Sequence, residues 1–435
     1  MMKSGRKWRN WSGIVQATPR DVYYPESIER IAEIVEKCRR EGRRIRVVGS
    51  GHSFTAIAAS DDVLVSLDLL QGIVSVDANA GTVTVWAGTK LKLLGELLHA
   101  EGFAQENLGD IDVQSIAGAI STGTHGTGIA FGTLATQVVG MTVVAGTGEV
   151  VSCTEASHPE LFKALQVSIG SLGIIVQITL RLRPSYKLRY ESSRVPLTDC
   201  LKRLPELKAQ HRNFEFYWFP YAEPCQLKMM NETDEPISPN RKLRDYINDV
   251  VMENALFGAL SGLTRRFPAL SPTVSRMCAA AATVTRKVEM SHRIYATTRL
   301  VRFNEMEYNI PADAMADVIR EMRETIAREK YRVHFPIECR YVQGDDIWLS
   351  PAYGRDSAYI AVHMYRGMPH EQYFADMERI FLRYGGRPHW GKLHTLEAAR
   401  LSTAYPMWEK FGWIRDEMDP DGILLNGYLR RVFGR

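Results

Sequence analysis

The 435-residue sequence has no apolar run long enough to cross a lipid bilayer. Even the apolar stretch at residues 256–263 is short, and Arg265 and Arg266 follow it. The N-terminal residues are positively charged but lack the apolar core of a secretory signal. We therefore expect no transmembrane segment and, by default, a cytoplasmic protein, with membrane association left open.

Paired cysteines and blocks of like charge are also missing. The six cysteines are far apart and form no Cys-x-x-Cys pair, so they indicate neither a zinc site nor a disulfide framework, and we expect no metal. Lysine and arginine number 54 against 50 acidic residues, without a long run of one sign. This balance argues against a nucleic-acid partner and favours a soluble globular protein.

Glycine-rich turns are present, and the most informative one follows residues 46–48, which are typical of the end of a strand. Residues 49–51 form a Gly-Ser-Gly turn that leads to His52. Glycines allow positive φ and let successive backbone N–H groups converge on one anion. On its own, the pattern also fits an ordinary turn between a strand and a loop.

Helix and strand patterns alternate around this turn. Apolar residues recur at spacings of three and four after Ser27, which predicts a helix with Ser27 as its N-cap, and residues 91–98 are again helical. Strands are expected at residues 43–48, 63–67, 82–87, 137–147, 149–152 and 176–182, with Pro184 ending the last. The mixture indicates an α+β or α/β arrangement, and the length predicts two domains.

A second unusual stretch, residues 115–128, consists of Gly, Ala, Ser and Thr except for Ile116, Ile120 and His125. Such a segment lets the backbone lie against a flat or phosphorylated ligand. The alternative is a tightly packed helix followed by a loop.

The later part of the chain contains strand-like runs, and one of them carries two opposite charges. Alternation along residues 336–341 places Glu338 and Arg340 on the same face of a strand. His363 lies in a similar run at residues 359–365. Without further information, Glu338 and Arg340 fit a structural ion pair as well as a site.

Three motifs together resemble a known family. Residues 48–54 (VGSGHSF), 123–128 (GTHGTG) and 170–175 (GSLGII) are similar to the FAD-binding domain of the vanillyl-alcohol-oxidase superfamily. The chain looks most like its sugar-lactone branch, the aldonolactone oxidases and dehydrogenases, which has the alditol oxidases as neighbours. The likeness continues through residues 305–308, 336–340 and 387–392.

The resemblance implies an α+β, two-domain, PCMH-type FAD-binding fold with a mixed α/β substrate cap domain. Residues 1–184 would bind FAD, residues 185–386 would form the cap, and residues 387–435 would return to the FAD domain. His52 would sit where relatives form a covalent bond to the flavin. The residues assigned to FAD binding are Gly49, Ser50, Gly51, His52, Ser53, Phe54, Gly109, Asp110, Ser115, Gly118, Ala119, Thr122, Gly123, His125, Gly126, Gly173 and Ile174.

For catalysis, the resemblance implies that Glu338 accepts or orients the proton of a substrate hydroxyl while hydride passes to the flavin. Arg340 and Lys392 would hold negative charge, and Asp110 and His363 would complete the site. Asp110 stands where alditol oxidases carry a serine, which favours an aldonolactone over a polyol. The stereochemistry of the sugar and the oligomeric state are not predicted.

The electron acceptor is expected to be oxygen or another, unknown acceptor. Gly109 matches the position that lies over the oxygen-reactive atoms of the flavin, so it predicts some oxidase activity with release of hydrogen peroxide. An alternative of another class is a flavin-binding protein without redox turnover. The joint presence of Glu338, Arg340 and Lys392 argues against that alternative.

Overall fold

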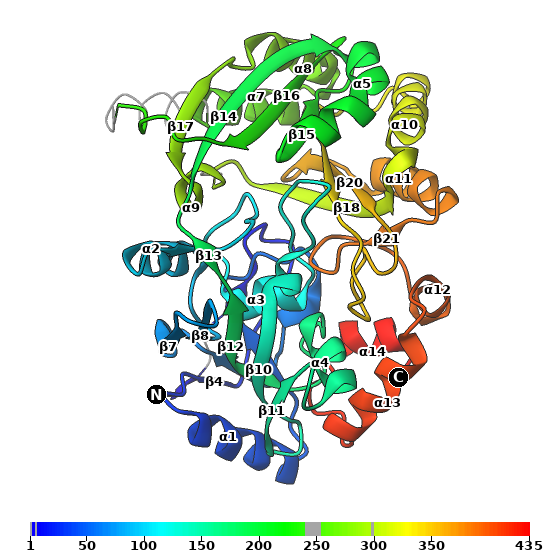
Figure 1. Ribbon diagram of the computed structural model, residues 1–435. Coiled ribbons are helices and arrows are strands. Elements are labelled where there is room, and N and C mark those ends of the chain that lie inside the picture. The colour runs from blue at the N-terminus through cyan, green and yellow to red at the C-terminus, as the bar shows by residue number, and fades with distance from the viewer. Residues whose placement is uncertain (1, 5–6, 240–253, 297–299) are drawn as a thin grey trace.

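The computed structural model describes residues 2–4, 7–239, 254–296 and 300–435. Three main sheets divide it into two parts (Figure 1). A four-stranded and a five-stranded sheet make up the lower part, and an eight-stranded sheet makes up the upper part. Among the described residues, no helix is both long and apolar enough to cross a membrane.

The four-stranded sheet carries the glycine turn at the end of one strand. Its order is β1 (Met2–Ser4), β4 (Asp21–Tyr23), β6 (Val63–Ser66) and β5 (Ile45–Val48), and β6 is parallel to both β4 and β5. Helix α1 (Ile28–Arg40) joins β4 to β5. Ser27 caps α1 as predicted, because its side chain accepts a hydrogen bond from the backbone N–H of Arg30.

The five-stranded sheet is antiparallel throughout, in the order β11 (Val150–Thr154), β10 (Val138–Val144), β12 (Ile174–Arg181), β8 (Thr82–Trp86) and β7 (Ile73–Asp77). Helices α2 (Leu91–Ala100), α3 (Ile116–Ser121) and α4 (Pro159–Gln166) accompany it. The small-residue stretch thus begins with a short helix, α3. Pro184 does not end the long strand, since β12 stops at Arg181 and Pro184 lies in β13 (Arg183–Pro184), which pairs with β9 (Phe103–Ala104).

The eight-stranded sheet is also antiparallel, and its central strands run β15, β19, β20 and β18. Its full order is β17 (Arg286–Met290), β14 (Lys187–Pro196), β16 (Pro224–Glu232), β15 (Asn213–Trp218), β19 (Ile337–Val342), β20 (Ser357–Tyr365), β18 (Phe303–Pro311) and β21 (Arg387–Pro388). Helices α5 (Leu197–Gln210), α10 (Met315–Glu329) and α11 (Glu371–Arg383) pack on one face. Three further helices are α7 (Asn254–Arg266), α8 (Ser271–Ala281) and α9 (Ser291–Ile294).

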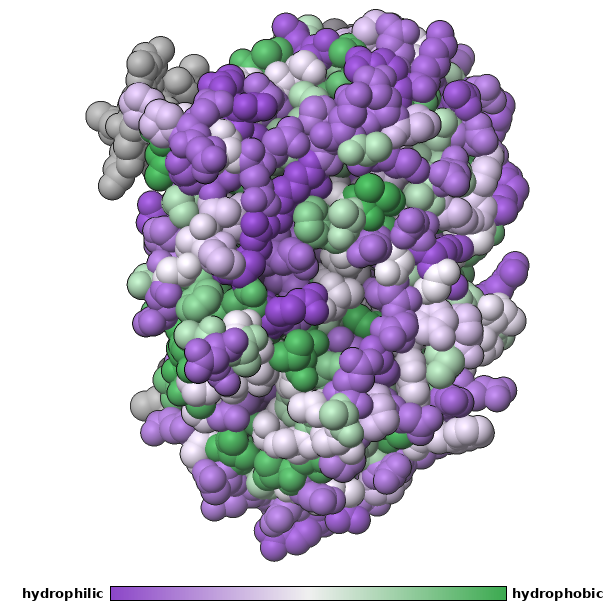
Figure 2. All heavy atoms as spheres, viewed as in Figure 1, coloured by the Kyte–Doolittle hydropathy of each residue, from purple (hydrophilic) through white to green (hydrophobic). Residues whose placement is uncertain are grey.

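Alternation gives the eight-stranded sheet two different faces. Apolar side chains such as Phe216, Cys339 and Met306 join the hydrophobic core under the helices. The intervening residues on the same strands are charged or polar, and they point towards the lower part of the molecule. Figure 2 shows hydrophilic side chains where the two parts meet.

The last helices return to the first two sheets (Figure 1). They are α12 (Ala398–Ala404), α13 (Trp408–Met418) and α14 (Gly427–Phe433). The Arg46 guanidinium, at the base of the glycine turn, donates to the backbone oxygen of Leu424 at 2.6 Å. The Asn426 side chain donates to the backbone oxygen of Ala56 at 2.8 Å. The C-terminal segment therefore braces the glycine turn, although β21, at its start, still belongs to the eight-stranded sheet.

Candidate active site

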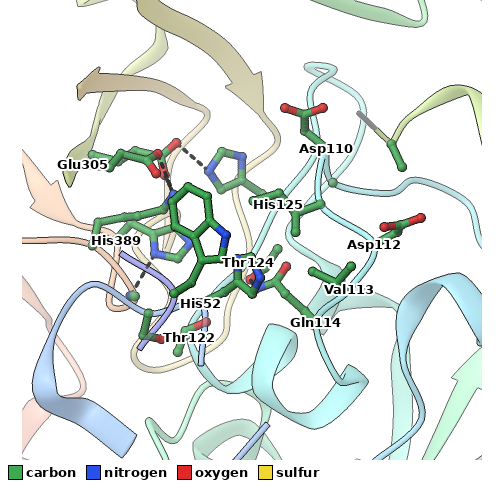
Figure 3. A pocket seen from close by; sticks show the side chains of 18 of the residues that line it. His52, Asp110, Asp112, Val113, Gln114, Thr122, Thr124, His125, Glu305 and His389 are labelled. Carbon is green, nitrogen blue, oxygen red and sulfur yellow. Dashed lines mark hydrogen bonds and ion pairs between the residues drawn. The ribbon is translucent and has the colours of Figure 1, made fainter. Parts of the chain in front are cut away.

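A cavity of about 710 Å³ lies between the charged face of the eight-stranded sheet and the loops at residues 109–114 and 122–125 (Figure 3). His52, Asp110, Glu338, Arg340 and Lys392 all line it. These residues are far apart in the sequence. The structure therefore brings together the predicted flavin-attachment histidine and four of the five predicted catalytic residues.

Arg340 is the centre of the first charge cluster in the cavity. Its Nε lies 2.7 Å from Glu215 Oε2, on the directly opposing residue of β15, and its terminal nitrogen contacts Glu338 Oε1. The same nitrogen lies 3.5 Å from Asp110 Oδ2. Burial opposes the charge on Arg340, but Glu338 and Glu215 outweigh it and raise the pKa well above the usual arginine value. Arg340 thus holds three carboxylates together, two from the sheet and one from a loop.

Lys392 is the centre of the second cluster. Its Nζ lies 2.5 Å from Glu305 Oε1 and 4.0 Å from Glu307 Oε2, two carboxylates that alternate along β18. Burial disfavours the charged form of Glu305, but Lys392 and His363 outweigh this and hold its pKa well below the usual value. Lys392 therefore faces the cavity as one half of an ion pair.

His125 balances the second carboxylate of this cluster. Its Nε2 lies 3.1 Å from Glu307 Oε1, and its Nδ1 lies 2.8 Å from the backbone oxygen of Gly126. A backbone carbonyl can only accept, and despite burial His125 and Lys392 lower the pKa of Glu307 to about 2. His125 therefore lies between two hydrogen-bond acceptors, the Glu307 carboxylate and the backbone carbonyl of Gly126.

His389 lies next to His125 and Glu307 and is neutral. Its Nδ1 accepts the backbone N–H of Gly391 at 3.0 Å, and burial lowers its pKa to about 3. The ligand atoms of His125, Glu307 and His389 lie within 4.8 Å of one another, a spacing that could hold a metal ion. Because His125 and Lys392 already contact Glu307, the geometry favours a hydrogen-bonded cluster over a metal centre.

His363 does not reach the cavity, contrary to its predicted catalytic role. Its side chain is only 3% exposed; Nδ1 donates to the backbone oxygen of Pro336 at 2.9 Å, and Nε2 lies 3.6 Å from Glu305 Oε1. His363 pairs directly with Glu305 across β18 and β20. It can orient Glu305 but cannot touch a substrate in this cavity.

A narrower cavity of about 120 Å³ adjoins the first and contains the glycine turn. His52, Ser53, Gln114 and Thr122 line both cavities, so these four residues separate the two spaces or lie at their border. The predicted FAD-binding residues at this groove are Gly49, Ser50, Gly51, His52, Ser53, Ser115, Gly118, Thr122 and Gly173. Those at the larger cavity are His52, Ser53, Phe54, Gly109, Asp110, Thr122 and His125.

The groove fits a phosphorylated ligand. A Cβ on Gly49 would lie 2.4 Å from Ser115 Oγ, so a side chain there would force Ser115 to move. Gly51 has φ of +67°. Within the described part of the chain, the backbone N–H groups of Ser50, Gly51 and Ser53 donate no hydrogen bond. Such a row of free donors is the nest expected for a pyrophosphate.

The N-terminal segment at Asn10 and Trp11, called the strap below, contacts the loop of His52. The sequence alone did not indicate this contact. The ring of Trp11 stacks on His52 with centroids 5.5 Å apart and planes 21° apart. The backbone N–H of Trp11 donates to the oxygen of Gly51 at 2.8 Å, and the Asn10 side chain donates to the oxygen of Ser53 at 3.0 Å. The strap therefore fixes the orientation of the imidazole.

Four of the residues assigned to FAD binding line neither cavity. Ala119 and Ile174 are buried in the hydrophobic core, and Ile175, the next residue of β12, lines the groove in place of Ile174. Gly123 has φ of +72°, and a Cβ on Gly126 would lie 2.2 Å from the backbone oxygen of Leu108. These two glycines are needed for the path of the backbone.

Several residues of the site were missed by the sequence interpretation. Glu305, Glu307 and His389 lie within quoted motifs but received no role, and Glu215 was not singled out. For Glu305 and Glu307 a signal was available, because strand alternation places them on one face, as it does for Glu338 and Arg340. No local signal links Glu215 to Arg340.

Comparisons with known proteins agree with this geometry. Residues 178–432 match the family model described as D-arabinono-1,4-lactone oxidase, and residues 19–154 match an FAD-binding domain. The chain belongs to the D-arabinono-1,4-lactone oxidase family. It is 39% identical to L-gulono-1,4-lactone dehydrogenase of Mycobacterium tuberculosis over 98% of this chain and 99% of that one. It is 32% identical to L-gulonolactone oxidase of Bos taurus over 99% and 98% of the two chains.

Solved structures show the same fold. Cholesterol oxidase from Brevibacterium sterolicum aligns with a TM-score of 0.84 at 17% identity and covers 100% of this chain and 97% of that one. The predicted α+β FAD-binding fold, the family and the assignment to FAD-dependent oxidoreductases are thereby confirmed. The division at residues 184 and 386 stays a prediction.

Proposed function

We propose that the protein oxidises a hydroxyl group of an aldono-1,4-lactone, with FAD as the hydride acceptor. The observation that carries this proposal is the Glu338–Arg340 pair, which lines a cavity next to the glycine groove. The family match and the names of the relatives favour a lactone over a polyol.

The residues around the cavity suggest separate roles. Arg340 contacts Glu338 and holds it in place, so that the Glu338 carboxylate can accept the hydroxyl proton. Asp110 lies 3.5 Å from Arg340 and would accept hydrogen bonds from sugar hydroxyls. Lys392 would stabilise the negative charge that arrives with the hydride. Its ion pair with Glu305 sets how strongly it stabilises that charge.

The decisive experiment is a panel of sugar lactones and polyols, read both with oxygen and with an artificial acceptor. We expect turnover with at least one aldono-1,4-lactone. Faster turnover of an open-chain polyol would favour the alditol oxidase alternative. A yellow protein that oxidises no compound in the panel would favour a flavin-binding protein without redox turnover.

We expect a covalent bond between His52 and the flavin, because the strap presents the imidazole as a preorganised nucleophile. Wild-type protein should stay yellow after acid precipitation, and His52→Ala should release its flavin. The matched control is Trp11→Phe, which keeps an aromatic ring against His52 and should retain covalent flavin. Flavin that washes out of the denatured wild type would contradict the assignment.

We expect oxygen to reoxidise the flavin along a path beside Gly109, which lines the larger cavity. Gly109→Ala should slow reoxidation by oxygen and largely preserve activity with an artificial acceptor. The added Cβ would lie 3.1 Å from the backbone oxygen of His125, so flavin content must be measured on the same sample. Equal rates of flavin reoxidation by oxygen in stopped-flow experiments, with intact flavin in the wild type and the variant, would show that oxygen does not depend on the space beside Gly109.

A further inference from the structure

A separate cavity of about 880 Å³ lies beside α7 and at the ends of β18 and β20. Its described lining includes three arginines, Arg265, Arg302 and Arg366, and contains no carboxylate. The larger active-site cavity, by contrast, mixes both signs of charge. The described part of this lining therefore carries charge of one sign only.

The three arginines come from different elements that meet at this point. Arg302 directly precedes β18 and Arg366 directly follows β20, and the Arg366 backbone N–H donates to the oxygen of Arg302 at 3.2 Å. Arg265 lies in the last turn of α7. Its Nη1 is 3.5 Å from the position that a Cβ on Gly367 would occupy. The Arg265 guanidinium therefore contacts the residue that follows Arg366.

None of these three side chains forms an ion pair or a hydrogen bond with another residue in the described part of the chain. Arg265 and Arg302 are exposed, and Arg366 is partly buried. Cations gathered at one hollow give it a positive potential that attracts anions. The guanidinium fork matches the oxygens of phosphate and carboxylate groups.

We propose that this cavity binds a small ligand carrying a phosphate or carboxylate group. Tyr365 and Val301 add an aromatic and an apolar wall beside the arginines, with the Arg265 guanidinium 6.0 Å from the Tyr365 ring centroid. The ligand class is therefore an anionic group attached to an apolar or ring-shaped body. The cavity volume is in the range of sites for small molecules, about 300–1,000 Å³.

The cavity is distinct from the substrate site but close to the strap over His52. The Arg366 guanidinium lies against Gly13, two residues after Trp11, at 3.1 Å from the position of a Cβ on Gly13. Tyr365 and Val301 pack against the same aromatic cluster as Phe303. The proposed anion would therefore lie behind the strap, outside the substrate cavity.

The test is calorimetric titration of inorganic pyrophosphate into the purified holoenzyme, in which flavin fills the glycine groove. At low ionic strength we expect saturable binding, weakened about tenfold or more in Arg265→Gln and in Arg366→Gln through loss of charge-assisted hydrogen bonds. The matched control is Arg266→Gln. Arg266 neighbours Arg265 but lies over the Phe267 ring, 5.7 Å from its centroid, and does not line the cavity.

An absence of saturable binding in the wild type, or an equal loss in Arg266→Gln, would overturn the proposal. The titration uses no lactone, so its outcome is independent of the proposed oxidation. Sedimentation with vesicles of phosphatidylcholine, with and without phosphatidylglycerol, identifies the source of the anion. Sedimentation that needs phosphatidylglycerol, Arg265 and Arg366 would indicate a lipid headgroup; pyrophosphate binding without sedimentation would indicate a soluble ligand.

Discussion

Replacement of Arg340 by methionine is expected to abolish lactone oxidation and to lower the free energy of unfolding by about 3–5 kcal/mol, the usual cost of breaking a buried ion pair. The physical reason is that Glu215, Glu338 and Asp110 all rely on one guanidinium. Without it, these carboxylates repel one another and take up protons. Denaturant titration and kcat with an artificial acceptor measure the two effects.

The matched variant is Glu338→Gln, which keeps the volume of the side chain and leaves Arg340 paired with Glu215. We expect a fall in turnover of about 10²–10⁴-fold, because a positioned proton acceptor is lost. The effect on unfolding should be much smaller than for the arginine variant, and flavin content should be unchanged. Near-normal turnover of Glu338→Gln would show that the Glu338–Arg340 ion pair has only a structural role.

Replacement of Lys392 by methionine is expected to lower turnover by about 10²–10³-fold, the usual effect of removing one preorganised charge stabiliser. It also leaves the buried Glu305 without its cation, 2.5 Å away in the native protein. Stability should therefore fall as well, by about 3–5 kcal/mol. The loss of turnover and the loss of stability follow from the same ion pair, but a second substitution should restore only the stability.

The double variant Lys392→Met with Glu305→Gln separates the two effects. It removes the unpaired carboxylate, so stability should recover towards the wild-type value while turnover stays low. The control for loss of a lysine is Lys163→Met, which breaks ion pairs with the exposed Asp346 and Glu155 and should cost at most about 1 kcal/mol. Recovery of turnover in the double variant would show that Lys392 does not act on the reaction.

Local patterns in the sequence were sufficient for most of the secondary structure and for the glycine turn. Strand alternation also placed Glu338 and Arg340 on one face. The partners of these residues could not be predicted, because Glu215 and Asp110 reach Arg340 through strand pairing and a loop distant in sequence.

His363 shows the limit of reasoning from a single strand. His363 lies on the charged face of the sheet, because it pairs directly with Glu305. Whether such a residue faces the cavity or lies behind its neighbour depends on the pairing of His363 with Glu305. A shift of one residue also decided between Ile174 and Ile175 at the groove. Only the three-dimensional structure shows which individual residues face the cavity and which are buried behind them.

The two-faced eight-stranded sheet restricts how this enzyme can change during evolution. In β18, insertion or deletion of one residue would exchange Glu305 and Glu307 with Met306 and Tyr308. Carboxylates would then enter the hydrophobic core, and apolar groups would enter the cavity. Indels in the central strands should therefore be lethal to both folding and chemistry at once. New substrate preferences are open mainly to point substitutions and to length changes in the loop at residues 109–114.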